Sequence, residues 1–375
     1  MAPSFTSLLV FTVRSLRFQI PIIQFYKYNP LVQGRDPVKV IRKALEQTLV
    51  LYYPFAGRLR EGHGAKLMVE CIGEDVLGSG EMLNCPLLLI QVTRLRCGGF
   101  ICALRLNHLM SDAPSIVQFM NAMGEMAQGA CAPSIPPVWQ RELLNARNAP
   151  QVTCTHHEFD ELVKPQSLIT NSLHELACCS FFFGSTQVSA IRKSIPHHLG
   201  KYSTFEDQVH LIFMNNMRTI LNPPLPRGYY GNAYAISLAI TTARELCENP
   251  LEYALELVRK AKANINDVYI RPFIDLVVSK GLPRTTIVQS FVVSNTALVG
   301  FRDVDYGWGK AIYGGVANIF ESPSTSATSF YIEAMNSKGE EGIMVPMCLP
   351  TLAMERFVQE LNSVLTRPIR WRSNG

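Results

Sequence analysis

The chain has 375 residues, of which 47% are hydrophobic and 17% charged, so it is an ordered globular chain of roughly two to three domains. Its formal net charge of +5 is small for this length, and basic residues concentrate only in the tail, at Arg367, Arg370 and Arg372. Nucleic-acid binding needs a denser basic stripe, so we exclude that class. A weakly basic surface can still attract a small polyanionic substrate.

The ten cysteines form no CxxC pair and lie mostly in apolar runs. We therefore expect buried free thiols in a reducing compartment, with neither a disulfide framework nor a zinc site. The N-terminal apolar run has no basic region before it, and no stretch reaches the roughly 18 apolar residues of a membrane span. These features predict a cytoplasmic monomer that has no membrane partner.

The first part of the chain alternates predicted strands and helices. Hydrophobic periodicity predicts helices over 37–53 and 114–129. The second of these helices turns a methionine-rich face inward, and we interpret that face as core. β-rich apolar runs predict the strands of this part, at 7–13, 19–26, 66–73, 86–95 and 100–108.

A proline-rich stretch and a polar, irregular segment then interrupt the pattern. We divide the chain into an N-terminal domain over 1–139, a crossover linker over 140–172 and a C-terminal domain over 173–375. The C-terminal part mixes predicted helices at 186–196, 250–267 and 351–366 with predicted strands at 177–184, 209–214, 285–295, 329–335 and 342–349. The predicted class is therefore α/β or α+β, with two domains of similar size.

One local signal is inconsistent with its surroundings. Ser203-Thr204-Phe205-Glu206 is a capping box, which should begin a helix. Only Asp207 and a glutamine follow before the strand-like run Val-His-Leu-Ile-Phe-Met. The start signal is present, but the helix is nearly absent, so the predicted C-terminal domain is shortened after Glu206.

His108 ends a predicted strand, and Asp112 follows four residues later at the start of a predicted helix. An imidazole has an unperturbed pKa near 6.5, so it can take a proton from an alcohol at neutral pH. The structural alternatives are a buried, satisfied histidine at 108 and a helix N-cap at Asp112, with Pro114 in the first turn. An HxxxD spacing alone favours these alternatives.

Three further runs favour a functional interpretation of the HxxxD motif. They are Asp305-Tyr306-Gly307-Trp308-Gly309, the Asn-Pro-Pro-Leu-Pro and Gly-Tyr-Tyr-Gly-Asn run over 222–232, and Tyr-Pro-Phe-Ala-Gly-Arg-Leu over 53–59. With HLMSD, and in this order, they resemble the signatures of the plant BAHD acyltransferases of the alcohol acyltransferase type. Tyr306 replaces the phenylalanine of the family's DFGWG motif. The resemblance covers nearly the whole chain.

The resemblance implies acyl transfer from an acyl-CoA to a small alcohol, with acyl-CoA as a co-substrate, no bound cofactor and no metal. It implies two chloramphenicol-acetyltransferase-like domains with a channel between them. His108 would be the general base. Asp112, Asp305, Gly307, Trp308 and Gly309 would be structural motif residues. Arg218 would pair with Asp112 or with Asp305, and the sequence leaves that choice open.

Compared with such relatives, the chain lacks residues after Ser15, after Leu77 and after Glu206. Two hypotheses follow: an active acyl-CoA-dependent alcohol O-acyltransferase, or a non-catalytic, truncated remnant of the family. Other enzyme classes lack their motifs, since the chain has no GxSxG elbow and no phosphate-binding glycine loop. His156-His157-Glu158 is a weak metal candidate, because adjacent histidines on a polar linker rarely converge on one ion.

Overall fold

The computed structural model describes residues 7–8, 18–61, 67–70, 86–159, 176–193, 208–280, 290–317 and 328–366. The helices and strands are, in chain order, β1 (Ser7–Leu8), β2 (Gln19–Tyr26), α1 (Pro37–Leu51), β3 (Arg58–Glu61), β4 (Leu67–Glu70), β5 (Leu88–Arg94), β6 (Phe100–Asn107), α2 (Ala113–Ala127), β7 (Leu176–Gly184), α3 (Ser185–Lys193), β8 (Gln208–Asn216), β9 (Tyr234–Thr242), α4 (Ala243–Glu248), α5 (Leu251–Ala263), α6 (Asp267–Lys280), β10 (Ser290–Asn295), β11 (Tyr313–Val316), β12 (Thr328–Met335), β13 (Glu341–Pro350) and α7 (Thr351–Thr366).

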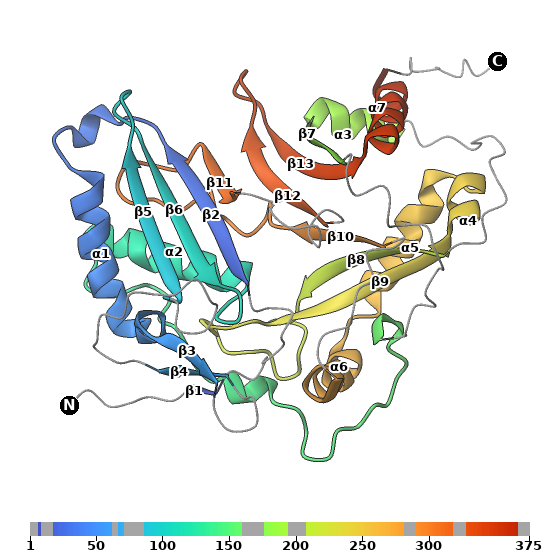
Figure 1. The fold of residues 1–375 in the computed structure, drawn as a ribbon, viewed down its shortest axis with the longest axis horizontal. Helices are drawn as coiled ribbons and strands as arrows, with labels where there is room; N and C mark the ends of the chain where they lie inside the picture. Colours follow the sequence, from blue (N-terminus) through green and yellow to red (C-terminus); the bar gives the residue numbers. More distant parts are fainter. Residues whose placement is uncertain are drawn as a thin grey trace.

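Most strands belong to one large mixed sheet that joins the two halves of the chain (Figure 1). Its main order is β5-β6-β2-β11-β12-β10-β8-β9, and β13 pairs with both β12 and β7. β1, β4 and β3 form a separate antiparallel sheet. This arrangement confirms the predicted mixed α/β class.

Strand β11 connects the two halves of the large sheet. It comes from the second half of the sequence, but it pairs antiparallel with β2, with Tyr313 opposite Phe25. Tyr313 also lies opposite Ala334 of β12. The sheet hydrogen bonds therefore run from the N-terminal strands into the C-terminal ones.

Helices α1 and α2 cover the N-terminal part of the sheet (Figure 1). α1 begins at Pro37, where the Asp36 carboxylate accepts a hydrogen bond from the backbone N–H of Val38. α2 buries the methionine-rich face that the sequence predicts, with side chains of Ile116, Phe119, Met120, Met123 and Met126 at most 7% exposed. That face is core, as expected.

The structure describes residues 140–159 of the predicted crossover. Residues 140–159 contain two short 3₁₀-helices, Arg141–Leu144 and His157–Phe159, and the rest of the predicted linker lies outside the described residues. The Arg147 guanidinium and Asp275 of α6 form a 2.7 Å ion pair in which the carboxylate is 1% exposed. The domain limits at 139 and 173 stay predictions.

Several sequence expectations can be scored directly. The predicted helices and strands of the described residues are present, whereas β3, β9, β11, α4 and α6 were not predicted as elements. The capping box at 203–206 lies outside the described residues, so its missing helix stays a prediction. Within the described part of the chain, no helix is long and apolar enough to cross a membrane.

The expectation of free, buried thiols was wrong for part of the chain. Cys178 of β7 and Cys348 of β13 face each other in the strand register and form a disulfide. Cys97, Cys131 and Cys247 are free but exposed. The sequence could not reveal the pair, because the two cysteines are 170 residues apart and meet only through strand pairing.

We predict that reduction of the Cys178–Cys348 bond destabilises the protein, because the bond closes a loop of 170 residues in the unfolded chain. The expected loss is about 2–4 kcal/mol in the free energy of unfolding, measured by denaturant titration with and without a phosphine reductant. Cys178→Ser should abolish the reductant effect, whereas Cys247→Ser should retain it. Alkylation of both cysteines in unreduced, unfolded protein would contradict the pairing.

Candidate active site

His108 is the first residue of a tight turn between β6 and α2. Its backbone N–H donates to the Phe18 carbonyl at 2.9 Å, which continues the β6–β2 pairing by one residue. The Asn107 side chain accepts from the Leu109 N–H at 3.1 Å, and the Asn107 carbonyl accepts from the Met110 N–H at 2.9 Å. The backbone of the predicted base is therefore held by a strand on one side and a closed turn on the other.

The imidazole of His108 lies between two aromatic rings from opposite halves of the chain. Phe18 contacts it edge-on, with ring centroids 5.1 Å apart. Tyr234, the first residue of β9, lies 6.3 Å away between ring centroids. Burial lowers the pKa of His108 below its ordinary value of 6.5, against the opposing effects of nearby hydrogen-bonding groups and of Asp112. The imidazole is thus neutral at pH 7, the form that a base requires.

Asp112 forms an ion pair with Arg218. Its two carboxylate oxygens each accept a hydrogen bond from the Arg218 guanidinium, both at 2.8 Å. They also accept from the backbone N–H groups of Ser115, at 3.2 Å, and Ala233, at 2.9 Å. Asp112 is therefore both the N-cap of α2 and an anchor to the second half of the chain.

This geometry answers the question that the sequence left open about Arg218. Its partner is Asp112. Arg218 also donates to the Gly231 carbonyl and to the Ser115 hydroxyl, each at 2.8 Å. One guanidinium thus joins the start of α2 to the turn that precedes β9.

Asp305 stabilises its own loop. Its carboxylate accepts from the backbone N–H groups of Gly307, at 2.6 Å, and Gly309, at 2.8 Å. Both glycines have positive φ, 99° and 91°, a conformation that side chains disfavour. The turn presents Trp308 to Phe100 of β6, with ring centroids 5.2 Å apart, and to the guanidinium of Arg35.

The DYGWG loop packs on the N-terminal half, although it comes from the second half of the sequence. The Tyr26 hydroxyl donates to the Val304 carbonyl at 2.9 Å, and the Gln24 amide donates to the Phe301 carbonyl at 2.6 Å. Both bonds are buried. The structure therefore brings this segment together with β2 and β6.

The remaining motif runs meet in an aromatic cluster at one end of α2. Tyr230 lies between Tyr52, at 5.0 Å, Phe55, at 5.8 Å, and Trp139, at 4.9 Å, measured between ring centroids. The 53–59 and 222–232 runs thus form a packing corner. Its role is to place the residues that follow Tyr230 beside the His108 turn.

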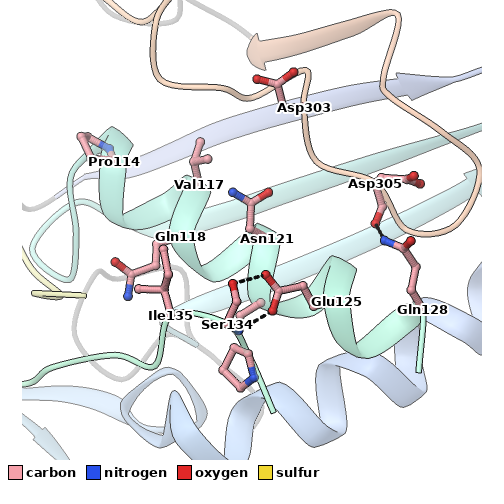
Figure 2. Close-up of a pocket in the computed structure, with 12 residues that line it drawn as sticks. Pro114, Val117, Gln118, Asn121, Glu125, Gln128, Ser134, Ile135, Asp303 and Asp305 are labelled. Carbon is pink, nitrogen blue, oxygen red and sulfur yellow. Dashed lines mark hydrogen bonds between the residues drawn. The ribbon is translucent and has the colours of Figure 1, made fainter. Parts of the chain in front are cut away.

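A cavity of about 410 Å³ lies between α2, residues 133–135 and the DYGWG loop (Figure 2). Figure 2 shows the Glu125 carboxylate bound to Ser134, and the Gln128 amide bound to the Asp305 carbonyl. His108 does not line this cavity. Its lining includes three acidic residues, Glu125, Asp303 and Asp305.

Three residues near His108 were not singled out from the sequence. Phe18 and Tyr234 begin or precede strands with no special pattern, and Asn232 was noted only as the last residue of a motif run. The Asn232 amide donates to the His108 carbonyl at 2.8 Å. Proximity in the fold, not spacing in the sequence, identifies all three. In the described residues no group of three or more His, Cys, Asp or Glu side chains could hold a metal ion.

We predict that Asp112→Ala strongly destabilises the protein, because it leaves the Arg218 guanidinium, 15% exposed, without its carboxylate partner. Removing one partner of a buried pair costs about 3–5 kcal/mol, which urea unfolding measures directly. Glu256→Ala, which breaks the exposed pair with Arg259, is the matched control and should leave the midpoint nearly unchanged. Equal midpoints for the two variants would refute the anchoring role of Asp112.

Comparison with known proteins places this site in a family. A sequence profile described as "Transferase family" matches residues 13–78, 75–193 and 188–364. The chain is 52% identical to benzyl alcohol O-benzoyltransferase of Nicotiana tabacum over 401 aligned positions, covering 93% of this chain and 87% of that protein. It is 43% identical to alcohol acyl transferase 2 of Malus domestica over 410 positions, covering 94% and 88%.

Solved structures share the fold at lower identity. Vinorine synthase matches with a TM-score of 0.68 and 17% identity, over 97% of this chain and 94% of its own. F. graminearum TRI101, complexed with coenzyme A and deoxynivalenol, matches with a TM-score of 0.69 and 12% identity, over 96% and 99%. These likenesses confirm the predicted fold.

The alignments also bear on the expected gaps. The alignment with the Nicotiana protein spans 401 positions, more than the 375 residues of this chain, so that relative carries segments that this chain lacks. The profile match breaks at residues 75–78, where a gap after Leu77 was expected, and again at 188–193. With the profile covering most of its length and relatives above 50% identity, the chain belongs to the BAHD acyltransferase family.

Proposed function

We propose that this protein transfers an acyl group from an acyl-CoA to the hydroxyl of a small alcohol, with His108 as the general base. One observation carries the assignment to His108: a neutral imidazole, partly buried, stands where β6 of the first half meets β9 of the second. Close relatives named as alcohol acyltransferases support the reaction class.

The chemistry needs only a base and a bound thioester. A ring nitrogen of His108 takes the proton of the acceptor hydroxyl as its oxygen attacks the thioester carbonyl. The tetrahedral intermediate collapses, the carbon–sulfur bond breaks, and the imidazolium returns the proton to the departing CoA thiolate. Because the alcohol attacks directly, no side chain is acylated, and the chain needs no activated serine or cysteine nucleophile.

Benzoyl-CoA and benzyl alcohol are the first substrates to test. Two relatives above 50% identity, from Nicotiana tabacum and Petunia hybrida, are both named benzyl alcohol O-benzoyltransferase. Phe18 beside the imidazole is 45% exposed, so an aromatic acceptor could pack against its ring. The binding of CoA itself is supported by the fold shared with a CoA complex.

The alternative function is a non-catalytic remnant, since this chain lacks segments that its relatives contain. Intact motif geometry favours the enzyme: the Asp112–Arg218 pair, the closed DYGWG loop and the turn that holds His108 are all formed. Of the three, the turn that holds His108 favours the enzyme most, because the other two stabilise the fold and a folded remnant would need them as well. The monomeric state, the cytoplasmic location and the channel between two domains stay predictions.

We predict that His108→Ala lowers the rate of ester formation by about 10²- to 10⁴-fold, the usual contribution of a general base. The measurement is CoA thiol release together with ester formation from benzoyl-CoA and benzyl alcohol. His157→Ala changes an exposed histidine of the crossover and should retain the rate. A wild-type rate in His108→Ala would refute the base, and no turnover by the unmodified chain across a substrate panel would favour the remnant.

We also predict the pH dependence of the reaction. Because burial lowers the pKa of His108 below 6.5, the base stays deprotonated through neutral pH and becomes protonated only in more acidic solution. The kcat/KM value should be level near pH 7 and fall as the pH drops through an apparent pKa below 6.5. An acid limb centred above pH 6.5 would contradict the burial of the base.

A further inference from the structure

Asn232 ends the turn that precedes β9, and its side chain reaches the His108 turn from the other half of the chain. The residue is 4% exposed. Its amide nitrogen donates to the carbonyl of His108 at 2.8 Å and to the carbonyl of Leu109 at 3.3 Å. The two N–H groups of the amide are therefore both engaged by the backbone of this turn.

These two bonds fix which way the carboxamide points. A flipped amide would set its oxygen against two carbonyl oxygens, and three acceptors without a donor repel one another. The Asn232 Oδ1 atom is therefore held on the side away from these carbonyls. It is an acceptor, and it cannot exchange places with the amide nitrogen.

Oδ1 of Asn232 and Nδ1 of His108 are among the buried polar atoms around this turn that have no hydrogen-bond partner in the described residues, and Oγ of Ser111 is another. Buried polar atoms are nearly always paired, and one of these can only accept. Burial lowers the pKa of the imidazole, and hydrogen bonding opposes it: the backbone of His108, the Asn232 side chain and the Ser111 backbone each act to raise that pKa. Nδ1–H of His108 can donate and Oδ1 of Asn232 can accept, so these two atoms can form a hydrogen bond with each other.

Building on the proposed role of His108, we propose that Asn232 is the positioning residue of the catalytic base. Its Oδ1 accepts a hydrogen bond from Nδ1–H of His108, and its amide nitrogen holds the His108 carbonyl. A neutral imidazole carries one N–H, so a proton kept on Nδ1 leaves Nε2 as the atom that takes the proton from the acceptor.

An amide suits this task better than a carboxylate. A carboxylate beside Nδ1 would stabilise the imidazolium and so raise the pKa of His108, whereas an amide orients the ring without adding charge. The nearest carboxylate, on Asp112, is already bound to Arg218. The other charged or titratable side chains packed around this turn are Arg141, bound to the Met110 carbonyl, the buried Tyr230 and the partly buried Tyr234.

The test compares Asn232→Asp and Asn232→Leu through the pH profile of kcat/KM. Asn232→Asp should move the acid limb up by about one pH unit or more, because the new carboxylate stabilises the imidazolium. Asn232→Leu should lower the plateau of kcat by about tenfold or more. It should also shift the acid limb of the kcat/KM profile to lower pH, because a favourable hydrogen bond to the protonated ring is lost. Asn249→Asp is the control, since its amide also donates to a carbonyl, that of Glu245, and it should leave the limb in place.

If Asn232 only supports the fold, its replacement should lower the protein yield or the rate and leave the acid limb of the kcat/KM profile at the same pH. An acid limb at the wild-type pH in both folded variants, Asn232→Asp and Asn232→Leu, would therefore overturn the proposal. A second measurement needs neither turnover nor a variant. Nitrogen-15 NMR of the histidine ring in the unmodified protein should show the proton on Nδ1. A proton on Nε2 would overturn the proposal, even if the protein catalyses acyl transfer. An Nδ1 proton in a protein without activity would support it while the proposed function fails.

Discussion

The ion pair between Asp112 and Arg218 is the contact on which the arrangement of this site depends. Asp112 caps α2, follows the His108 turn and binds the arginine that precedes β9. Arg218 also donates a hydrogen bond to the Gly231 carbonyl. This bond holds the turn in which the next residue, Asn232, lies beside His108. One charged pair between distant parts of the chain thus determines where the base stands relative to the second half.

The DYGWG loop and β11 provide the other link between the halves. Asp305 closes its loop on two backbone N–H groups, and the loop then packs on β2 and β6, the strands that carry Phe18 and His108 at their ends. β11 follows at once and completes the sheet between β2 and β12. Neither link touches the reacting atoms, and both keep the two halves together.

Much of this could be predicted from the sequence, because local patterns report local structure. Periodicity indicated α1, α2 and α5, and Asp112 followed by Pro114 marked the cap of α2. The four motif runs indicated the family. The partner of Arg218, the Cys178–Cys348 bond and the neighbours of His108 could not be predicted, because each joins residues separated by 90 or more positions whose meeting depends on sheet order. The disulfide also conflicts with a reducing compartment, where such bonds are rare.

The central claim is that a shortened chain still assembles two halves around one base and binds CoA there. The most direct measurement is a thermal melt of the protein with and without CoA. A ligand that binds only the folded form raises the midpoint as its concentration exceeds its dissociation constant. The account predicts one cooperative transition that CoA moves upward. A midpoint that saturating CoA leaves unchanged, or two transitions that melt independently, would contradict it.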